Sequence, residues 1–168
     1  MKTTGYALRE AIKQHELRKD TAAGAFDGSL KMWPGENKEP PTTIVDTFLR
    51  AEAAIAKLQT VQAKYNLTVQ VEFDGRKMTL SEAIKLIGGI ARVEKMWRSV
   101  AAPKKDRYGY DRDERQAGVT VAVATMTSSE AVKLAQAAAK RAGALRATIA
   151  TANAQEVEIE NLDLSLFE

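Results

Sequence analysis

The sequence contains no cysteine among its 168 residues and only one histidine, His15. Without cysteine, the chain has no disulfide, no thiol nucleophile and no thiolate ligand for zinc or an iron–sulfur cluster. One histidine is too few for a three-histidine zinc site or for the two Glu-x-x-His motifs of a di-iron bundle. We therefore predict no metal site and no cofactor, and we assign no catalytic residue.

Long apolar runs are absent as well. No stretch approaches the about 20 apolar residues of a membrane-spanning helix, and residues 1–13 contain no apolar signal segment. We therefore expect a cytoplasmic protein without a membrane partner. Apolar residues make up 45% and charged residues 28% of the chain, a balance typical of a globular protein. The length is that of one domain, 1–168.

Charge is distributed unevenly. Residues 1–84 contain 12 Lys/Arg and 11 Asp/Glu, a net +1. Residues 85–146 contain 13 and 6, a net +7, whereas residues 147–168 contain none and 5, a net −5. Either the basic middle pairs with the acidic end, or it is available to an anionic partner.

Helical spacing of apolar residues predicts a first helix over 4–23. Leu8, Ile12 and His15 fall on one stripe, and Gly24 is a natural helix stop. Because the sequence supplies no reaction partner for His15, we expect it to be a core-edge residue with a hydrogen bond rather than a general base.

A loop rich in glycine and proline follows at 24–42, and we expect its Trp33 to pack over the edge of the core. Thr43 is the expected N-cap of a helix over 43–66. The apolar seam of this helix is typical of an antiparallel hairpin or of a coiled coil between chains. Its members are Ile44, Phe48, Ala51, Ile55, Leu58 and Tyr65.

Alternating residues around Asp74–Gly75 predict a β-hairpin over 68–80, because Asp-Gly tolerates the positive φ angles of a type I′ turn. Thr79 and Glu82 then form a capping box at the start of a helix over 80–101. This helix is apolar nearly all round, which indicates cover on two sides, the second by another subunit.

The remainder divides into a charged loop at 101–116, a strand at 117–126, a helix at 128–153 and an acidic tail at 154–168. The last helix is rich in alanine, and Arg141 lies beside its apolar stripe, where burial would require a negative partner. The expected fold is mostly α (α+β), with long helical hairpins, one β-hairpin and short strands.

The charged loop is the best candidate for a ligand site. Arginine and lysine can bind phosphates, and tyrosines can stack on a base. The interleaved acidic residues argue against a nucleic-acid surface and favour a small anionic ligand. The alternative is a surface loop that pairs with the acidic tail of a neighbouring subunit. The candidate ligand-binding residues are Lys104, Lys105, Arg107, Tyr108, Tyr110, Arg112, Arg115 and Arg141.

In this order of motifs the chain resembles the septicolysin-like proteins, small bacterial and phage proteins. The resemblance is carried by the heptads from Leu8 to Leu17, the loop Gly35–Pro40, Tyr65–Asn66, the turn Asp74–Arg76 and the segment Thr79–Ala83. It implies a helical homo-oligomer, with a hexamer as one form.

Three functions remain open. The first is a non-enzymatic homo-oligomer that binds or sequesters a small anionic, nucleotide-like ligand at subunit junctions, as a nucleotide sponge does. The second is a structural or protein–protein interaction scaffold without a ligand. The third is a hydrolase acting on a phosphorylated substrate.

Overall fold

The computed structural model describes residues 2–102, 125–160 and 162–167. It divides the chain into two compact units. Unit 1 combines Met1–Glu82 with Thr148–Glu168, and unit 2 is Ala83–Ala147. The described residues are mostly helical, with two small antiparallel sheets, so the expected mostly α, α+β class is confirmed.

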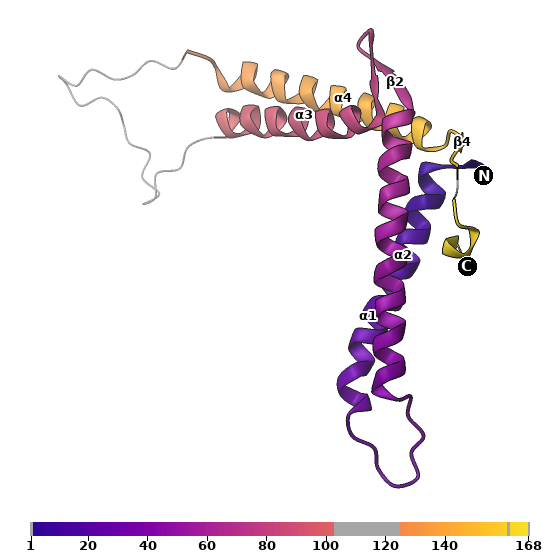
Figure 1. The fold of residues 1–168 in the computed structure, drawn as a ribbon. Helices are drawn as coiled ribbons and strands as arrows, with labels where there is room; N and C mark the ends of the chain where they lie inside the picture. Colours follow the sequence, from indigo (N-terminus) through magenta and orange to yellow (C-terminus); the bar gives the residue numbers. More distant parts are fainter. Residues whose placement is uncertain (1, 103–124, 161, 168) are drawn as a thin grey trace, which may run out of the picture. The chain divides into compact units, whose positions relative to one another are not determined.

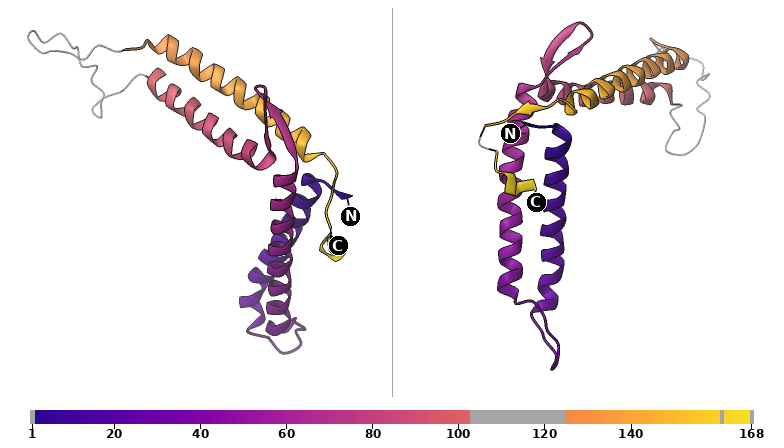
Figure 2. Two further views of the ribbon diagram at one scale, coloured as in Figure 1. Left: turned by 45° about the horizontal axis from the view of Figure 1, so that its top comes forward. Right: turned by 90° about the vertical axis from the view of Figure 1, so that its right-hand side faces the viewer.

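Unit 1 is built on a pair of helices, α1 (Gly5–Ser29) and α2 (Pro41–Thr68), which run side by side in Figures 1 and 2. Each helix buries one stripe with heptad spacing, and the two stripes form the shared core. The buried residues are Leu8, Ala11, Ile12, His15 and Ala22 of α1 and Ile44, Ala51, Ala54, Ile55, Leu58 and Tyr65 of α2. The predicted apolar seam of α2 therefore packs against α1 of the same chain, as in the hairpin alternative. Full burial of one leucine contributes about 1.5–3 kcal/mol.

The predicted end of the first helix is wrong. Helix α1 continues through Gly24 to Ser29, and the half-buried Phe26 extends the stripe one step beyond Ala22. Packing of these side chains against α2 outweighs the roughly 1 kcal/mol that a helical glycine costs. The loop therefore begins at residue 30, and its Trp33 is 74% exposed rather than packed over the core.

The predicted start of the second helix is also displaced. Helix α2 begins at Pro41, which occupies the first turn, and no side chain caps it. The amide of Thr43 instead donates to the Pro40 carbonyl (3.0 Å), so Thr43 is inside the helix and not its N-cap. Proline suits this position because its missing N–H would have no helical partner.

The predicted β-hairpin is confirmed. Strands β2 (Gln70–Phe73) and β3 (Arg76–Thr79) pair antiparallel, and the turn residues Asp74 and Gly75 have φ of 51° and 70°. Helix α3 (Leu80–Ala101) follows directly. Its capping box is present: Glu82 Oε2 accepts from the Thr79 amide (2.7 Å), and Thr79 Oγ1 accepts from the Glu82 amide (3.2 Å).

Unit 2 contains most of α3 and of α4 (Ser128–Asn153), which lie side by side in Figures 1 and 2. The predicted bounds of both helices are confirmed, as is the second capping box, between Thr127 and Glu130. The charged loop at 101–116 lies outside the described residues from 103 onward. The predicted strand at 117–126 also falls outside them, except for its last two residues, which form a bend.

The chain returns to unit 1 at its C-terminal end. Strand β4 (Val157–Glu158) pairs antiparallel with β1 (Lys2–Thr3), and a 3-10 helix, η1 (Leu164–Phe167), buries Leu166. The sequence predicts an acidic tail here, but no local pattern indicates this pairing. Among the described helices, none combines the length and apolar character that crossing a bilayer requires.

Candidate functional site

Of the eight candidate ligand residues, the structure places one. Lys104, Lys105, Arg107, Tyr108, Tyr110, Arg112 and Arg115 lie outside the described residues. Arg141 is on α4, in unit 2. Whether the eight residues come together therefore stays a prediction.

Arg141 lies on the exposed surface of α4 rather than in its buried stripe. The buried residues of this helix within unit 2 are Ala131, Ala135, Ala142 and Leu145. Arg141 precedes Ala142 and therefore faces about 100° away from it. The expectation that Arg141 is buried is therefore wrong for the described chain.

Arg141 contributes instead to the wall of a groove along the α3–α4 hairpin. The groove has a volume of about 470 Å³ and lies entirely within unit 2. Helix α3 contributes Leu86, Gly89, Ile90 and Val93, and α4 contributes Ala137, Ala138 and Arg141. The lining is thus apolar, with one cationic side chain at the wall.

Gly89 keeps the groove open. A Cβ built at this glycine meets no atom within 4 Å, so no part of the described chain requires glycine there. Glycine inside a helix costs about 1 kcal/mol relative to alanine. Packing within the described chain does not account for this cost.

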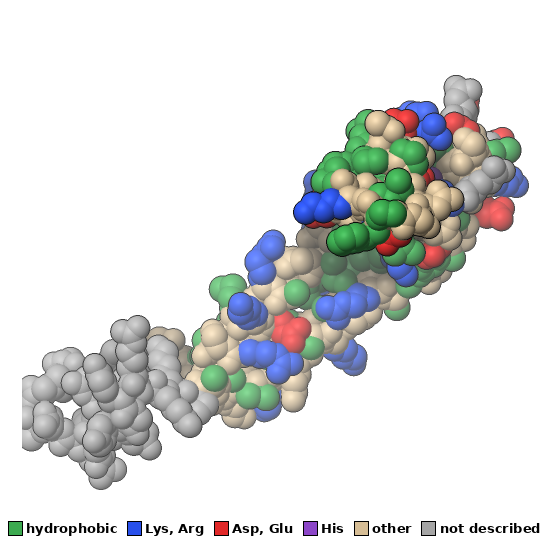
Figure 3. Space-filling model, turned by 90° about the horizontal axis from the view of Figure 1, so that it is seen from below, with side chains coloured by type: hydrophobic (Ala, Val, Ile, Leu, Met, Phe, Trp, Pro, Cys, Tyr) green, Lys and Arg blue, Asp and Glu red, His purple; other side chains and the backbone are tan. Residues whose placement is uncertain are grey.

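Unit 2 is strongly basic. Its described residues contain eight Lys/Arg and two Asp/Glu, a net +6. The basic residues are Lys85, Arg92, Lys95, Arg98, Lys133, Lys140, Arg141 and Arg146; the acidic residues are Glu94 and Glu130. Figure 3 shows blue basic side chains gathered along the part of this hairpin that leads to the grey atoms. Such a surface attracts anions and acidic partners.

His15 is a structural residue, as expected. Its ring is buried in unit 1, and Nε2 donates to the carbonyl of Leu166 (3.0 Å), because a carbonyl can only accept. Nδ1 is buried without a hydrogen-bond partner among the described residues. The contact holds η1 on α1, and no sequence pattern linked these two segments.

Tyr65 forms a second polar contact that the sequence analysis missed. Its side chain is fully buried, and its hydroxyl lies 2.8 Å from the carbonyl oxygens of both Ala152 and Gln155. Burial raises the pKa of Tyr65, and the Gly5 backbone offsets part of that rise. A Cβ on Gly5 would overlap Asn153 Oδ1 and come within 2.9 Å of Tyr65 Cε1, so here the close approach does require glycine.

Acidic and histidine side chains do not cluster in the described ranges: no group of three could hold a metal ion there. The described part of the chain therefore presents two kinds of candidate surface. One is the basic, apolar groove of unit 2, and the other comprises the exposed apolar side chains of unit 1.

Comparisons with known proteins give a fold and no activity. No family model matches the chain, and no curated protein matches it. The structure is similar to a solved structure described as a functionally unknown conserved protein from Corynebacterium diphtheriae. The TM-score is 0.69 at 19% sequence identity, over 94% of this chain and 100% of that chain. At this identity, the likeness shows that the two proteins share a fold.

Proposed function

We propose that this protein is a non-enzymatic scaffold that assembles from copies of itself through its helical hairpins. The observation that carries the proposal is the exposure of large apolar side chains along both hairpins. Leu17, Leu49 and Leu67 in unit 1 and Met96 in unit 2 are each more than half exposed.

The distribution of these side chains supports self-association. Helix α3 buries Ala83 and Ile90 inside its own unit, yet Val93, Met96 and Val100 remain exposed. Apolar surface of this extent is typical of protein interfaces, since burying it removes it from water. A second copy of the chain presents the same exposed apolar side chains. Most soluble oligomers consist of identical chains.

The mass of the purified protein tests this proposal. Sedimentation equilibrium or light scattering from low to high micromolar concentration should give a multiple of the chain mass of 18.4 kDa. A protein that remains at 18.4 kDa throughout would contradict it.

A second candidate is a homo-oligomer that binds or sequesters a small anionic, nucleotide-like ligand at its subunit junctions. The observation in its favour is that Arg141, an exposed residue, lies on the wall of an apolar groove in a unit whose described residues have a net charge of +6. The charged loop would supply the other contacts, and the resemblance to septicolysin-like proteins supplies the expectation of an oligomer such as a hexamer.

Ligand binding is tested separately from assembly. A nucleotide that binds the native state raises the melting temperature, so a thermal-shift panel of nucleotides separates the second candidate from a scaffold without a ligand. Chromatography of the same mixtures tests the hydrolase alternative, because a hydrolase would convert the nucleotide to a product.

A further inference from the structure

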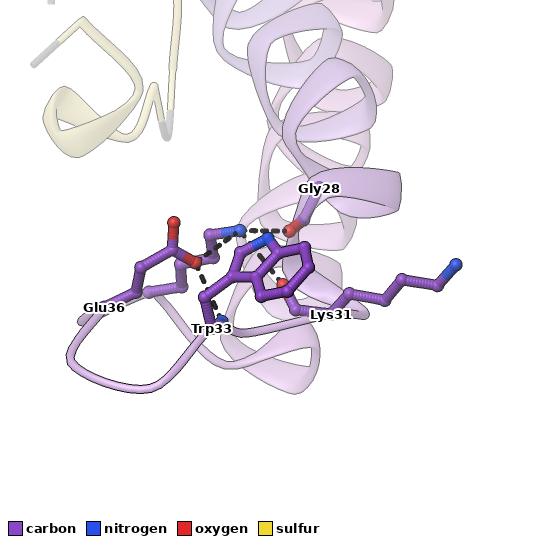
Figure 4. Close-up of polar contacts among 5 residues, drawn as sticks. Gly28, Lys31, Trp33 and Glu36 are labelled. Carbon is purple, nitrogen blue, oxygen red and sulfur yellow. Dashed lines mark hydrogen bonds and ion pairs between the residues drawn. The ribbon is translucent and has the colours of Figure 1, made fainter.

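Side-chain contacts within the loop connect the two ends of the α1–α2 hairpin loop. Lys38 Nζ donates to the carbonyl oxygens of Gly28 (3.2 Å) and Lys31 (3.0 Å) and lies 3.1 Å from Glu36 Oε2 (Figure 4). One lysine thus joins both sides of the loop.

Glu36 completes this arrangement. Its Oε2 accepts from the amide of Trp33 (3.0 Å), and its own amide donates to the Trp33 carbonyl (3.1 Å). Gly35 between them has a φ of +90°, which glycine adopts without strain. The Trp33 amide and the Lys38 ammonium lower the pKa of Glu36. The carboxylate that organises the loop therefore stays charged at neutral pH.

This organised loop presents apolar side chains to solvent. Leu30, Met32 and Trp33 are 58%, 65% and 74% exposed. We call these three residues the tip. A tip whose backbone is already ordered loses little conformational entropy on binding, and Trp is among the residues that contribute most at interfaces.

The apolar surface continues from the tip onto the helices. A pocket of about 290 Å³ lies between the end of α1 and the start of α2, with Phe26, Val45 and Phe48 in its lining. Figure 3 views this end of unit 1 and shows hydrophobic side chains gathered there. The tip is therefore part of a larger apolar surface.

The charge around the tip indicates the partner. Residues 27–46 contain Asp27, Glu36, Glu39 and Asp46 but only two lysines, a net −2. Anionic lipid surfaces attract basic segments, so this charge disfavours a bilayer. It favours a basic, apolar partner, and unit 2 of the same chain has both properties: a net +6 over its described residues and a groove whose lining includes Gly89.

We infer that the tip of one copy docks into the α3–α4 groove of a second copy, with Met32 and Trp33 packed over Gly89 and between Leu86 and Val93. The inference rests on the proposed self-assembly and names the two surfaces that meet. Because these surfaces differ, the contact is head-to-tail, and a docked pair retains one free groove on the first copy and one free tip on the second.

Filling the groove tests one side of the contact. Gly89→Leu adds a side chain where a Cβ meets nothing within 4 Å, so the chain should fold and the groove should be blocked. Gly143→Leu is the matched control: that position on α4 is also open, but it is two residues past Arg141 and faces away from the groove. We expect at least a ~10-fold weaker self-association for Gly89→Leu alone.

Removing the apolar tip tests the other side. The double variant Met32→Ser, Trp33→Ser should weaken self-association at least ~10-fold. The control is Leu164→Ser, because Leu164 in η1 is exposed to a similar degree, 60%, and lies outside the tip and outside both helical hairpins. Circular dichroism and melting temperature establish that each variant is folded.

Mixing the two blocked variants provides the decisive measurement. The groove variant retains a tip and the tip variant retains a groove, so an equimolar mixture should form a species of twice 18.4 kDa that neither forms alone. A mixture that remains monomeric overturns the inference.

The remaining outcomes separate this inference from the proposed function. If the parent protein is monomeric, both fail. If all variants assemble like the parent, self-assembly stands and the tip–groove contact is wrong. If the parent binds phosphatidylcholine–phosphatidylserine vesicles, and the tip variant loses that binding but assembles normally, the tip belongs to a bilayer and the inference is overturned.

Discussion

Tyr65→Phe should destabilise unit 1 although it removes a single oxygen atom. The ring is fully buried, and phenylalanine has nearly the same shape, so no large cavity forms. The hydroxyl has one proton and lies 2.8 Å from each of the Ala152 and Gln155 carbonyls, so its loss leaves these acceptors without that donor. Loss of such a buried hydrogen bond costs about 1–3 kcal/mol of unfolding free energy.

Tyr6→Phe is the matched control. Its hydroxyl also donates to a carbonyl at the end of α4, that of Ala150, but at 3.2 Å and from a side chain that is 46% exposed. Water can replace this bond, so the expected loss is below about 0.5 kcal/mol. Urea unfolding followed by circular dichroism measures both, and each kcal/mol should lower the melting temperature by about 2–4 °C. Equal unfolding midpoints for the two variants would refute the reasoning.

Three further predictions concern backbone, pH and charge. Gly24→Ala should stabilise α1 by up to about 1 kcal/mol, whereas Gly5→Ala should destabilise unit 1 because its Cβ has no room; urea unfolding compares them. Hydrogen bonds from the Thr79 amide and hydroxyl lower the pKa of Glu82 in the folded chain. The contribution of ionised Glu82 to stability is therefore fully present above its unfolded-state pKa of about 4.3 and is lost as the pH falls through its lower folded-state pKa. A pH series of melting curves should show a weaker loss of stability in acid for Glu82→Gln than for the parent. Arg141→Ala should change the unfolding free energy by less than about 0.5 kcal/mol, since the side chain is exposed, and if the second candidate function holds it should weaken nucleotide binding by calorimetry.

Features that depend on neighbouring residues were predictable from the sequence. The turn at Asp74–Gly75 and the Thr79–Glu82 capping box need only adjacent side chains and backbone amides, and both are present. The α1–α2 seam was predictable because heptad spacing fixes which residues share a face. The stop at Gly24 failed because packing beyond that residue, by Phe26 among others, outweighs the intrinsic cost of a glycine.

The contacts that close unit 1 could not be read from local patterns. His15 contacts a carbonyl 151 residues away, and the Tyr65 hydroxyl reaches one 87 residues away. Strand β1 has two residues, too few for any alternation to be visible. Arg141 illustrates the opposite error: adjacency to an apolar stripe was interpreted as burial, but one position on a helix turns a side chain by about 100°.

Unit 1 is discontinuous in sequence, and this affects how the chain is made. The pairing of β1 with β4, and the contact of His15 with Leu166, join residues near opposite ends of the 168-residue chain. On the ribosome, the α1–α2 hairpin can form early, but its closing contacts must wait until residues 152–166 emerge. During that interval, the Tyr65 hydroxyl lacks its two carbonyl partners, and the nascent hairpin exposes the surface that the C-terminal segment will cover.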